Sequence, residues 1–152
     1  MVGYGGEFMR ISAKGRYAIA ALLRMAQAGK DTVVNITRLS EGLGISRIYL
    51  EQVFALLKRA QLVTSIQGAQ GGYQLAHAPS QISMLDILHA TDISLFEKPG
   101  KTLSEDAQDA EAALDLVSNR LEQAVEQSLS SLHLSDLMEE AARSQNNYMF
   151  FI

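Results

Sequence analysis

Four side chains that follow Ser46 have the types and the spacing to read the edges of DNA bases. Arg47 and Glu51 are four positions apart, and so are Ile48 and Gln52. On a helix both pairs lie on one face. Glutamine favours adenine, glutamate accepts a hydrogen bond from cytosine N4, and isoleucine can touch the methyl group of thymine. The stretch therefore predicts a surface that reads base edges in a major groove.

The helix that would hold these side chains is predicted to begin after Ser46, a residue type that caps helix N-termini. Its inward face is expected to carry the apolar residues at helical spacing, Leu50, Val53, Phe54 and Leu57. A shorter helix, capped by Asn35 and running through Leu43, precedes it. Gly42 and Gly44 break the chain between the two helices. Two helices joined by a glycine-containing turn are typical of a helix-turn-helix.

Changes in periodicity predict the neighbouring elements. Residues 12–29 carry apolar residues at helical spacing and end on Gly29, which predicts a first helix. After Ala60 the short runs LVTSI and YQL, separated by QGAQGG, predict a β-hairpin with a glycine-rich tip. Pro79 ends the hairpin. Ser83 and the aspartate three residues later resemble a capping box, so a fourth helix is expected through about Ala90.

Two physical explanations are expected for glycine at the hairpin tip, at Gly68, Gly71 and Gly72. A tight hairpin needs positive φ at some positions. Backbone without side chains can also enter a minor groove closely. The hairpin is therefore interpreted as the wing of a winged helix-turn-helix.

The second half of the chain predicts an assembly element. The segment DISLFEKPGKTLSED is expected to be a loop, and a helix is predicted from Ala107 to about Leu132. Its apolar positions alternate steps of three and four, which would expose a seam unless a second helix covers it. The residues expected to dimerise are Leu114, Val117, Leu121 and Val125. A short last helix is expected to start near Ser135, ahead of the apolar tail YMFFI.

The expected architecture is mainly α: a winged helix-turn-helix with a small β-hairpin wing plus a long C-terminal dimerisation helix. The domain boundaries follow from these elements. Residues 1–8 are a leader or disordered extension, 9–91 the DNA-binding domain, 92–106 the loop, 107–147 the dimerisation helix and last helix, and 148–152 the tail.

Composition and charge exclude several classes of protein. The chain has 152 residues, no cysteine and a net charge of −4. Without cysteine, disulfides, thiolate nucleophiles and cysteine-held zinc or iron–sulfur clusters are excluded. Residues 9–75 hold nine basic residues against three acidic ones, and residues 76–152 hold four against thirteen. The first half can therefore approach a polyanion that would repel the second half.

Enzymatic and membrane functions are not expected. The sequence has no local Ser/His/Asp grouping, no G-x-x-x-x-G-K phosphate loop and no HExxH. It also has no apolar run suited to a bilayer and no signal-peptide pattern. A cytoplasmic protein without a membrane partner is expected.

Three stretches, MRISAKGRYAIAALL, ISRIYLEQVFALLKRAQLV and SIQGAQGGYQL, resemble the N-terminal domain of the Rrf-two family of bacterial transcription regulators. The likeness runs from Met9 to about Ala90. It implies a homodimer that binds palindromic operators in double-stranded DNA, with the long helix forming most of the dimer interface. It also implies wing contacts at Gln67 and Gly68. Gln67 departs from the family, whose members commonly carry arginine there, and a neutral amide should weaken attraction to a minor groove.

The expected DNA contacts combine the family's base-reading positions with candidate phosphate contacts. They are Arg10, Lys14, Arg16, Ser46, Arg47, Ile48, Tyr49, Glu51, Gln52, Lys58, Arg59, Gln67 and Gly68. A single basic residue is more often a solvated charge than a phosphate contact. The expectation therefore depends on their gathering around the helix-turn-helix.

Cluster-bearing members of the family carry three cysteines in the loop where this chain has DISLFEKPGKTLSED. A thiolate-held cluster is excluded here. His77, His89 and His133 are spread over the wing, the fourth helix and the late segment, so they are interpreted as ordinary surface histidines. No metal and no cofactor are expected.

Within the family the chain most resembles the cysteine-free, CymR-like repressors of cysteine metabolism, which also end on a Tyr-Met-Phe-aromatic-Ile tail. This resemblance implies control by complex formation with the cysteine-synthesis enzyme O-acetylserine thiol-lyase. That enzyme receives the C-terminal isoleucine of serine acetyltransferase in its active site. The hypothesis is that Tyr148, Met149, Phe150, Phe151 and Ile152 bind the enzyme, with Ile152 inserted. The opposing interpretation is that the tail covers the dimer helix.

Two other functions stay open. A regulator of the same family could sense a small molecule or a cofactor without cysteine ligands, in a cavity between the fourth helix and the dimer helix. A protein-interaction adaptor could assemble partners through the long helix and tail without DNA. The gathering of basic residues on the helix-turn-helix counts against the adaptor.

Overall fold

The computed structural model describes residues 10–98 and 100–150, and for residues 148–150 the backbone alone. The predicted leader at 1–8, Met9, and the last two tail residues lie outside the described residues. The main helices are α1 (Ala13–Ala28), α2 (Ile36–Leu43), α3 (Arg47–Arg59), α4 (Met84–Thr91), α5 (Gln108–Ser130) and α6 (Leu134–Phe150). The strands β1 (Val63–Ile66) and β2 (Gly72–Leu75) form the hairpin, and the short helices are η1 (Pro79–Gln81), η2 (Ile93–Phe96) and η3 (Glu105–Ala107).

The first four main helices begin where the sequence predicts them. The side chains of Ser12, Asn35 and Ser46 accept backbone N–H bonds in the first turns of α1, α2 and α3. Ser83 and Asp86 form a reciprocal capping box at the start of α4. Each cap pairs N–H groups that have no partner within the helix. These helix starts are therefore fixed by residues close in sequence.

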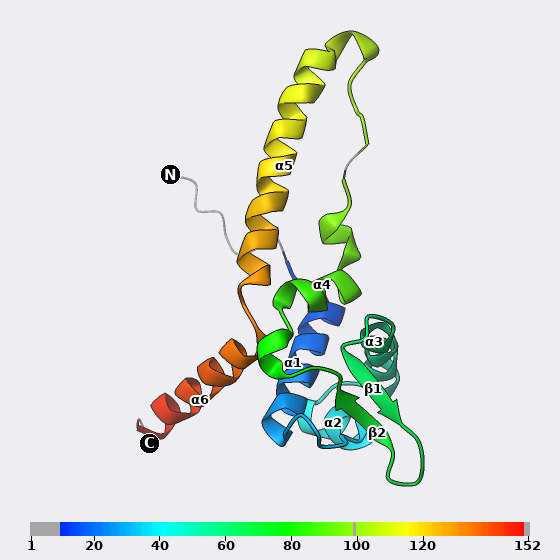
Figure 1. Ribbon diagram of the computed structural model, residues 1–152, viewed down its shortest axis with the longest axis vertical. Helices are drawn as coiled ribbons and strands as arrows, with labels where there is room; N and C mark the ends of the chain where they lie inside the picture. The colour runs from blue at the N-terminus through cyan, green and yellow to red at the C-terminus, as the bar shows by residue number, and fades with distance from the viewer. Residues whose placement is uncertain (1–9, 99, 151–152) are drawn as a thin grey trace.

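The core of the N-terminal half lies where α1, α3, α4 and the hairpin meet (Figure 1). The predicted inward stripe of α3 is confirmed, because Leu50, Val53, Phe54 and Leu57 are fully buried. The Phe54 ring lies 4.7 Å from the ring of Tyr73 in β2. Packing of the stripe against the wing therefore fixes how α3 is rotated about its axis.

The wing is a two-stranded antiparallel hairpin in which Val63 pairs with Leu75 and Ile66 with Gly72. Gly68 has a positive φ of 113°. The expectation of positive φ is wrong for the other two tip glycines, since Gly68 is the only one of the three among the described positive-φ residues. A Cβ at Gly71 would overlap the carbonyl oxygen of Ile66, and a Cβ at Gly72 that of Val34. These two glycines allow close approach of backbone instead.

The segment after α4 is more ordered than the predicted loop, because η2 and η3 lie within it. Residues 92–98, which we call the strap, lie beside the lower part of α5 (Figure 1). Lys98 Nζ lies 3.4 Å from Glu122 Oε2 of α5. The backbone N–H groups of Thr102 and Leu103 both donate to Glu111 Oε1, at 3.0 and 2.8 Å. Side chains of α5 therefore hold both described parts of the predicted loop.

The last helix is not short. α6 has 17 residues and includes Tyr148 to Phe150, so these three tail residues continue the helix. Leu134 at its start is fully buried, and its N–H donates to the carbonyl oxygen of Ile82 at 2.8 Å. From there α6 runs away from α5 (Figure 1). The sequence misses this length because only the first half of α6 carries a regular apolar face.

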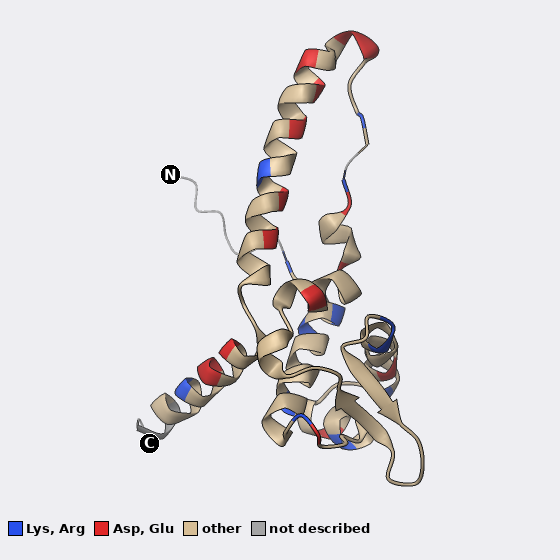
Figure 2. Cartoon of the chain, in the orientation of Figure 1, with Lys and Arg blue, Asp and Glu red and all other residues tan. Residues whose placement is uncertain are grey.

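Charge is divided in space as it is in sequence. Acidic residues follow α5 along most of its length, and basic residues lie mainly on the helices of the N-terminal half (Figure 2). Among the described residues, no helix combines the length and the apolar character needed to cross a membrane.

Candidate nucleic-acid interface

The turn between α2 and α3 is built on Gly44. Gly44 has the left-handed φ of 66°, and the N–H of Ile45 donates to the carbonyl oxygen of Ser40 at 3.1 Å. Glycine adopts this conformation at the lowest steric cost, because it has no Cβ. Gly42, predicted to break the chain as well, lies within α2. A single glycine therefore turns the chain from α2 into α3.

The predicted base-reading face of α3 is exposed as a unit. Arg47, Ile48, Glu51 and Gln52 all lie on the side of α3 away from the core. Ile48 is 71% exposed, which is unusual for a large apolar residue next to a core helix face. Because the opposite side of α3 is fully buried, the helix can present only this face to a groove.

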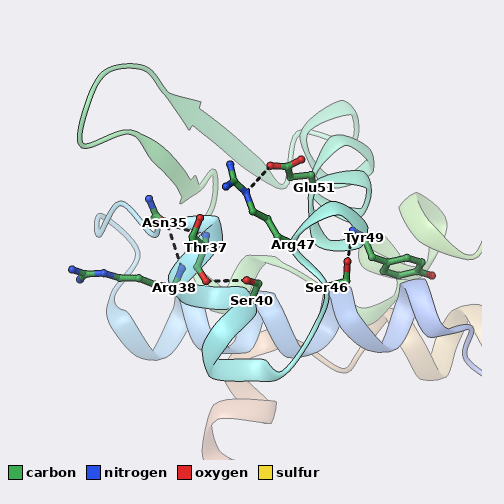
Figure 3. A network of polar contacts seen from close by, with 8 residues as sticks. All are labelled: Asn35, Thr37, Arg38, Ser40, Ser46, Arg47, Tyr49 and Glu51. Carbon is green, nitrogen blue, oxygen red and sulfur yellow. Dashed lines mark hydrogen bonds and ion pairs between the residues drawn. The ribbon is translucent and has the colours of Figure 1, made fainter.

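Two of these residues interact with each other. Arg47 Nε donates to Glu51 Oε1 at 3.1 Å, and both side chains are at least half exposed (Figure 3). The bond uses one nitrogen of the guanidinium and one oxygen of the carboxylate. It therefore aligns the two groups on the outer face of α3 while further donors and acceptors remain for base edges.

Tyr49 has a different setting from the other predicted contacts on α3. Its ring is half-buried and meets the ring of Tyr17 edge to face, with centroids 5.3 Å apart. Ser46 caps the helix by accepting from the Tyr49 N–H at 3.4 Å. Tyr49 thus joins the first turn of α3 to α1.

The predicted phosphate contacts do not form a single group. Lys14 and Arg16 are exposed in the first turns of α1, and Lys58 and Arg59 are exposed in the last turn of α3. Positive charge at a helix C-terminus is also favourable for the helix itself. Arg10 is elsewhere: it lines a cavity of about 300 Å³ between the start of α1, α4 and α5.

The tip of the wing places Gln67 and Gly68 in an exposed position at the end of the hairpin. Beside the tip lies a groove that sequence reasoning missed, lined by Asn35 and Arg38 of the α2 start and by Gln70. Asn35 Oδ1 accepts from the N–H groups of Thr37 and Arg38, and the Arg38 side chain extends away from the helices (Figure 3). The cap was visible in the sequence, but its position beside the wing was not.

The predicted dimerisation residues are solvent-exposed in the single chain. Leu114, Val117 and Leu121 are 48%, 66% and 56% exposed. Val125 is half-buried and lines a cavity of about 230 Å³ between α5 and the strap. No residue of α5 with a described side chain is buried. An apolar stripe of this kind on a monomer marks an interaction surface.

The three histidines lie in separate places. The His77 ring nitrogen lies 3.1 Å from the carbonyl oxygen of Gln61, His89 meets the ring of Phe96, and His133 lies beside Asp136. Among the described residues, no three His, Asp or Glu side chains are grouped as metal ligands.

Comparisons with known proteins agree with this geometry. A family model described as "Rrf2: Iron-dependent Transcriptional regulator" matches residues 11–140. The HTH-type transcriptional regulator CymR of Bacillus subtilis is 33% identical over 144 residues, which covers 95% of this chain and all of that protein. Other curated relatives match over 87 residues only, and the chain spans about half of their length. These relatives are named as transcriptional regulators, not as enzymes.

Two solved structures share the fold. The structure described as T. potens IscR superposes with a TM-score of 0.69 and 31% identity, covering 93% of this chain and 94% of the other. The structure described as CymR, "the Global Cysteine Regulator of B. subtilis", has a TM-score of 0.67 and 31% identity, covering 87% and 98%.

The family's description names iron, and the residues of this chain decide whether a cysteine-held iron cluster fits. The chain contains no cysteine. Asp92 in the strap is buried and bound to Ser12. The described residues therefore do not fit a thiolate-held iron–sulfur cluster.

Proposed function

The chain belongs to the Rrf2 family of transcriptional regulators, and we propose that it acts in the cytoplasm as a homodimeric repressor that binds palindromic operators in double-stranded DNA. The observation that carries the proposal is the exposed face of α3, with Ile48, Glu51 and Gln52 turned outward on a helix that packs against β1 of the wing. A helix buried on one face and polar on the other, next to a hairpin, suits the major groove and an adjacent minor groove.

The exposed stripe on α5 supports the homodimer. Residues 110–125 would need a second helix to cover them, and a second copy supplies the same stripe by symmetry. A two-fold pair of α3 helices would then match two half-sites of a palindrome. The acidic outer surface of α5 would face away from the DNA.

We propose that this regulator controls genes of cysteine and sulfur metabolism. The support is the likeness to CymR along its whole length and the description of that protein as a global cysteine regulator. The absence of cysteine in this chain agrees with a regulator whose signal arrives through a partner rather than a thiolate-held cluster.

The partner we propose is O-acetylserine thiol-lyase, which would receive the C-terminal isoleucine in its active site. Two features of α6 support this. Its described side chains from Ala142 to Asn147 are all exposed, and its backbone runs away from α5 as far as Phe150 (Figure 1). A projecting helix can present its C-terminus to another protein, whereas a tail covering α5 of the same chain would need α6 to turn back.

Calorimetric titration of the thiol-lyase from the same organism tests this partner. The intact chain is compared with a chain that lacks Ile152. Binding that the deletion removes, and that O-acetylserine weakens by competition, is the expected result. A thiol-lyase that binds neither chain contradicts the partner but leaves DNA binding to its own test.

DNA binding is tested by in vitro selection from a random-sequence pool. We expect a palindromic site whose affinity falls steeply with salt and survives competitor DNA. A protein that selects no sequence, or a selected site without two-fold symmetry, contradicts the proposed function.

Direct sensing of a small molecule is the second candidate. The cavity lined by Ile11, Leu88 and Leu129 lies between α4 and α5, where such a sensor would bind an apolar ligand. Its apolar lining is equally suited to a helix of a second chain. Ligand-dependent DNA affinity in the absence of thiol-lyase would favour this candidate.

A further inference from the structure

The carboxylate of Asp92 joins the strap to the N-terminus of α1. Asp92 is only 4% exposed. Its Oδ2 accepts the backbone N–H of Ser12 at 2.7 Å, and its Oδ1 accepts the Ser12 hydroxyl. Ser12 Oγ in turn accepts the N–H of Gly15 at 3.1 Å, which is the cap of α1. The local Ser12 cap of α1 is thus itself held by a side chain 80 residues away in sequence.

Gly15 provides the space for this carboxylate. A Cβ at position 15 would lie 2.6 Å from Asp92 Oδ1 and 2.7 Å from Ile11 Cγ2. Glycine within a helix is less favourable than alanine, because it has more backbone freedom to lose. The close approach of Asp92 therefore gives a physical reason for glycine at this helical position.

The strap contacts both α4 and α5 through its side chains. The Phe96 ring meets His89 of α4 with centroids 4.0 Å apart, and Lys98 pairs with Glu122 of α5. Leu95 lines both of the cavities described above, each of which is also lined by α5. A change in how α5 pairs, or a ligand beside Leu95, would therefore move the strap.

A chain of contacts through α1 links Asp92 to α3. About one turn of helix separates Ser12 from Arg16 and Tyr17, and Tyr17 meets Tyr49 in the first turn of α3. α1 also packs directly on α3 and α4. A shift of the start of α1 would therefore displace the first turn of α3, where Arg47 and Ile48 lie.

We propose that Asp92 is a positioning residue for DNA binding, through which the placement of the strap against α5 sets the orientation of α1 and α3. This rests on the proposed DNA-binding function. The physical basis is that a buried carboxylate which loses its donors is strongly destabilised, so Ser12 and Asp92 move together.

Four variants separate positioning from simple stability. Asp92→Ala removes the carboxylate. Gly15→Ala keeps every bonding group but pushes the carboxylate away, and alanine favours the helix, so this variant should stay folded. Ser12→Thr keeps the hydroxyl and is the matched control. Phe96→Ala loosens the strap without touching α1.

The first measurement is affinity for a labelled duplex selected by the native protein, with folding checked by circular dichroism. Asp92→Ala and Gly15→Ala should weaken DNA binding about tenfold, which is in the range of allosteric couplings. The control Ser12→Thr should keep near-native affinity. Phe96→Ala should weaken binding in the native background and have no further effect in Gly15→Ala. Native affinity in folded Gly15→Ala, or additive effects of the two substitutions, would overturn the proposal.

The second measurement needs no DNA. Hydrogen exchange of the backbone amides from Ala13 to Tyr17 is compared between the native protein and Phe96→Ala. Faster exchange in the variant supports coupling of the strap to α1, and identical exchange contradicts it. If the native protein binds no selected duplex, the proposed function fails, and hydrogen exchange still decides whether the strap and α1 are coupled.

Discussion

On the outer face of α3, Nε of Arg47 lies 3.1 Å from Oε1 of Glu51. Both residues are predicted to read bases, and they also pair with each other. An exposed ion pair contributes about 0.2–1 kcal/mol, whereas a good contact to a base edge discriminates by about 1–3 kcal/mol. Base contacts should therefore replace or redirect the pair when DNA binds.

Glu51→Ala should relax base preference at one operator position while leaving the free energy of unfolding within about 0.5 kcal/mol of native, because the side chain is exposed. In vitro selection with the native and variant proteins measures the preference. Glu140→Ala on α6 is a charge-matched control. The same base preference at every position in the variant would contradict a reading role for Glu51.

Lys58→Gln should weaken binding to all sequences alike and lower the slope of log affinity against log salt by about one. The reason is that a phosphate contact releases a counterion without reading a base. Titration of the selected duplex at several salt concentrations measures the slope. Arg143→Gln on α6 removes the same charge far along the chain and should leave the slope unchanged. An unchanged slope in Lys58→Gln would mean that Lys58 is a solvated charge that stabilises the end of α3.

Leu121→Glu should convert the proposed homodimer to a monomer, because it places a charge in the middle of the apolar stripe on α5. Sedimentation velocity measures the oligomeric state. Asn119→Glu lies two positions away, on a different face of α5, and should remain dimeric. A dimeric Leu121→Glu, or a native protein that is already a monomer, would contradict dimerisation through this face.

Leu134→Ala should lower the free energy of unfolding by about 2–5 kcal/mol, because Leu134 is fully buried where α6 joins the core. Leu132→Ala, two residues earlier and 41% exposed, should change it much less. Urea denaturation monitored by circular dichroism measures both. Equal effects would show that α6 is not anchored through Leu134.

Much of the N-terminal half was predictable because its signals are local. Ser46 caps α3, and the stripe from Leu50 to Leu57 is buried, as the spacing of residue types indicates. Predictions failed where the governing contact comes from another part of the chain. Gly72 has no positive φ and instead makes room for the carbonyl oxygen of Val34, a residue that no pattern within the hairpin brings close.

The sequence by itself determined the helix starts, the hairpin and the exposed stripe of α5, because caps and periodicity depend on residues within a few positions of each other. Only the tertiary structure decided that Arg38 lies beside the wing, that Arg10 lies near α5, and that Asp92 caps α1 through Ser12. These contacts depend on how α4 and the hairpin pack against α1, and the cost of burying a carboxylate or overlapping a backbone is set by neighbours distant in sequence.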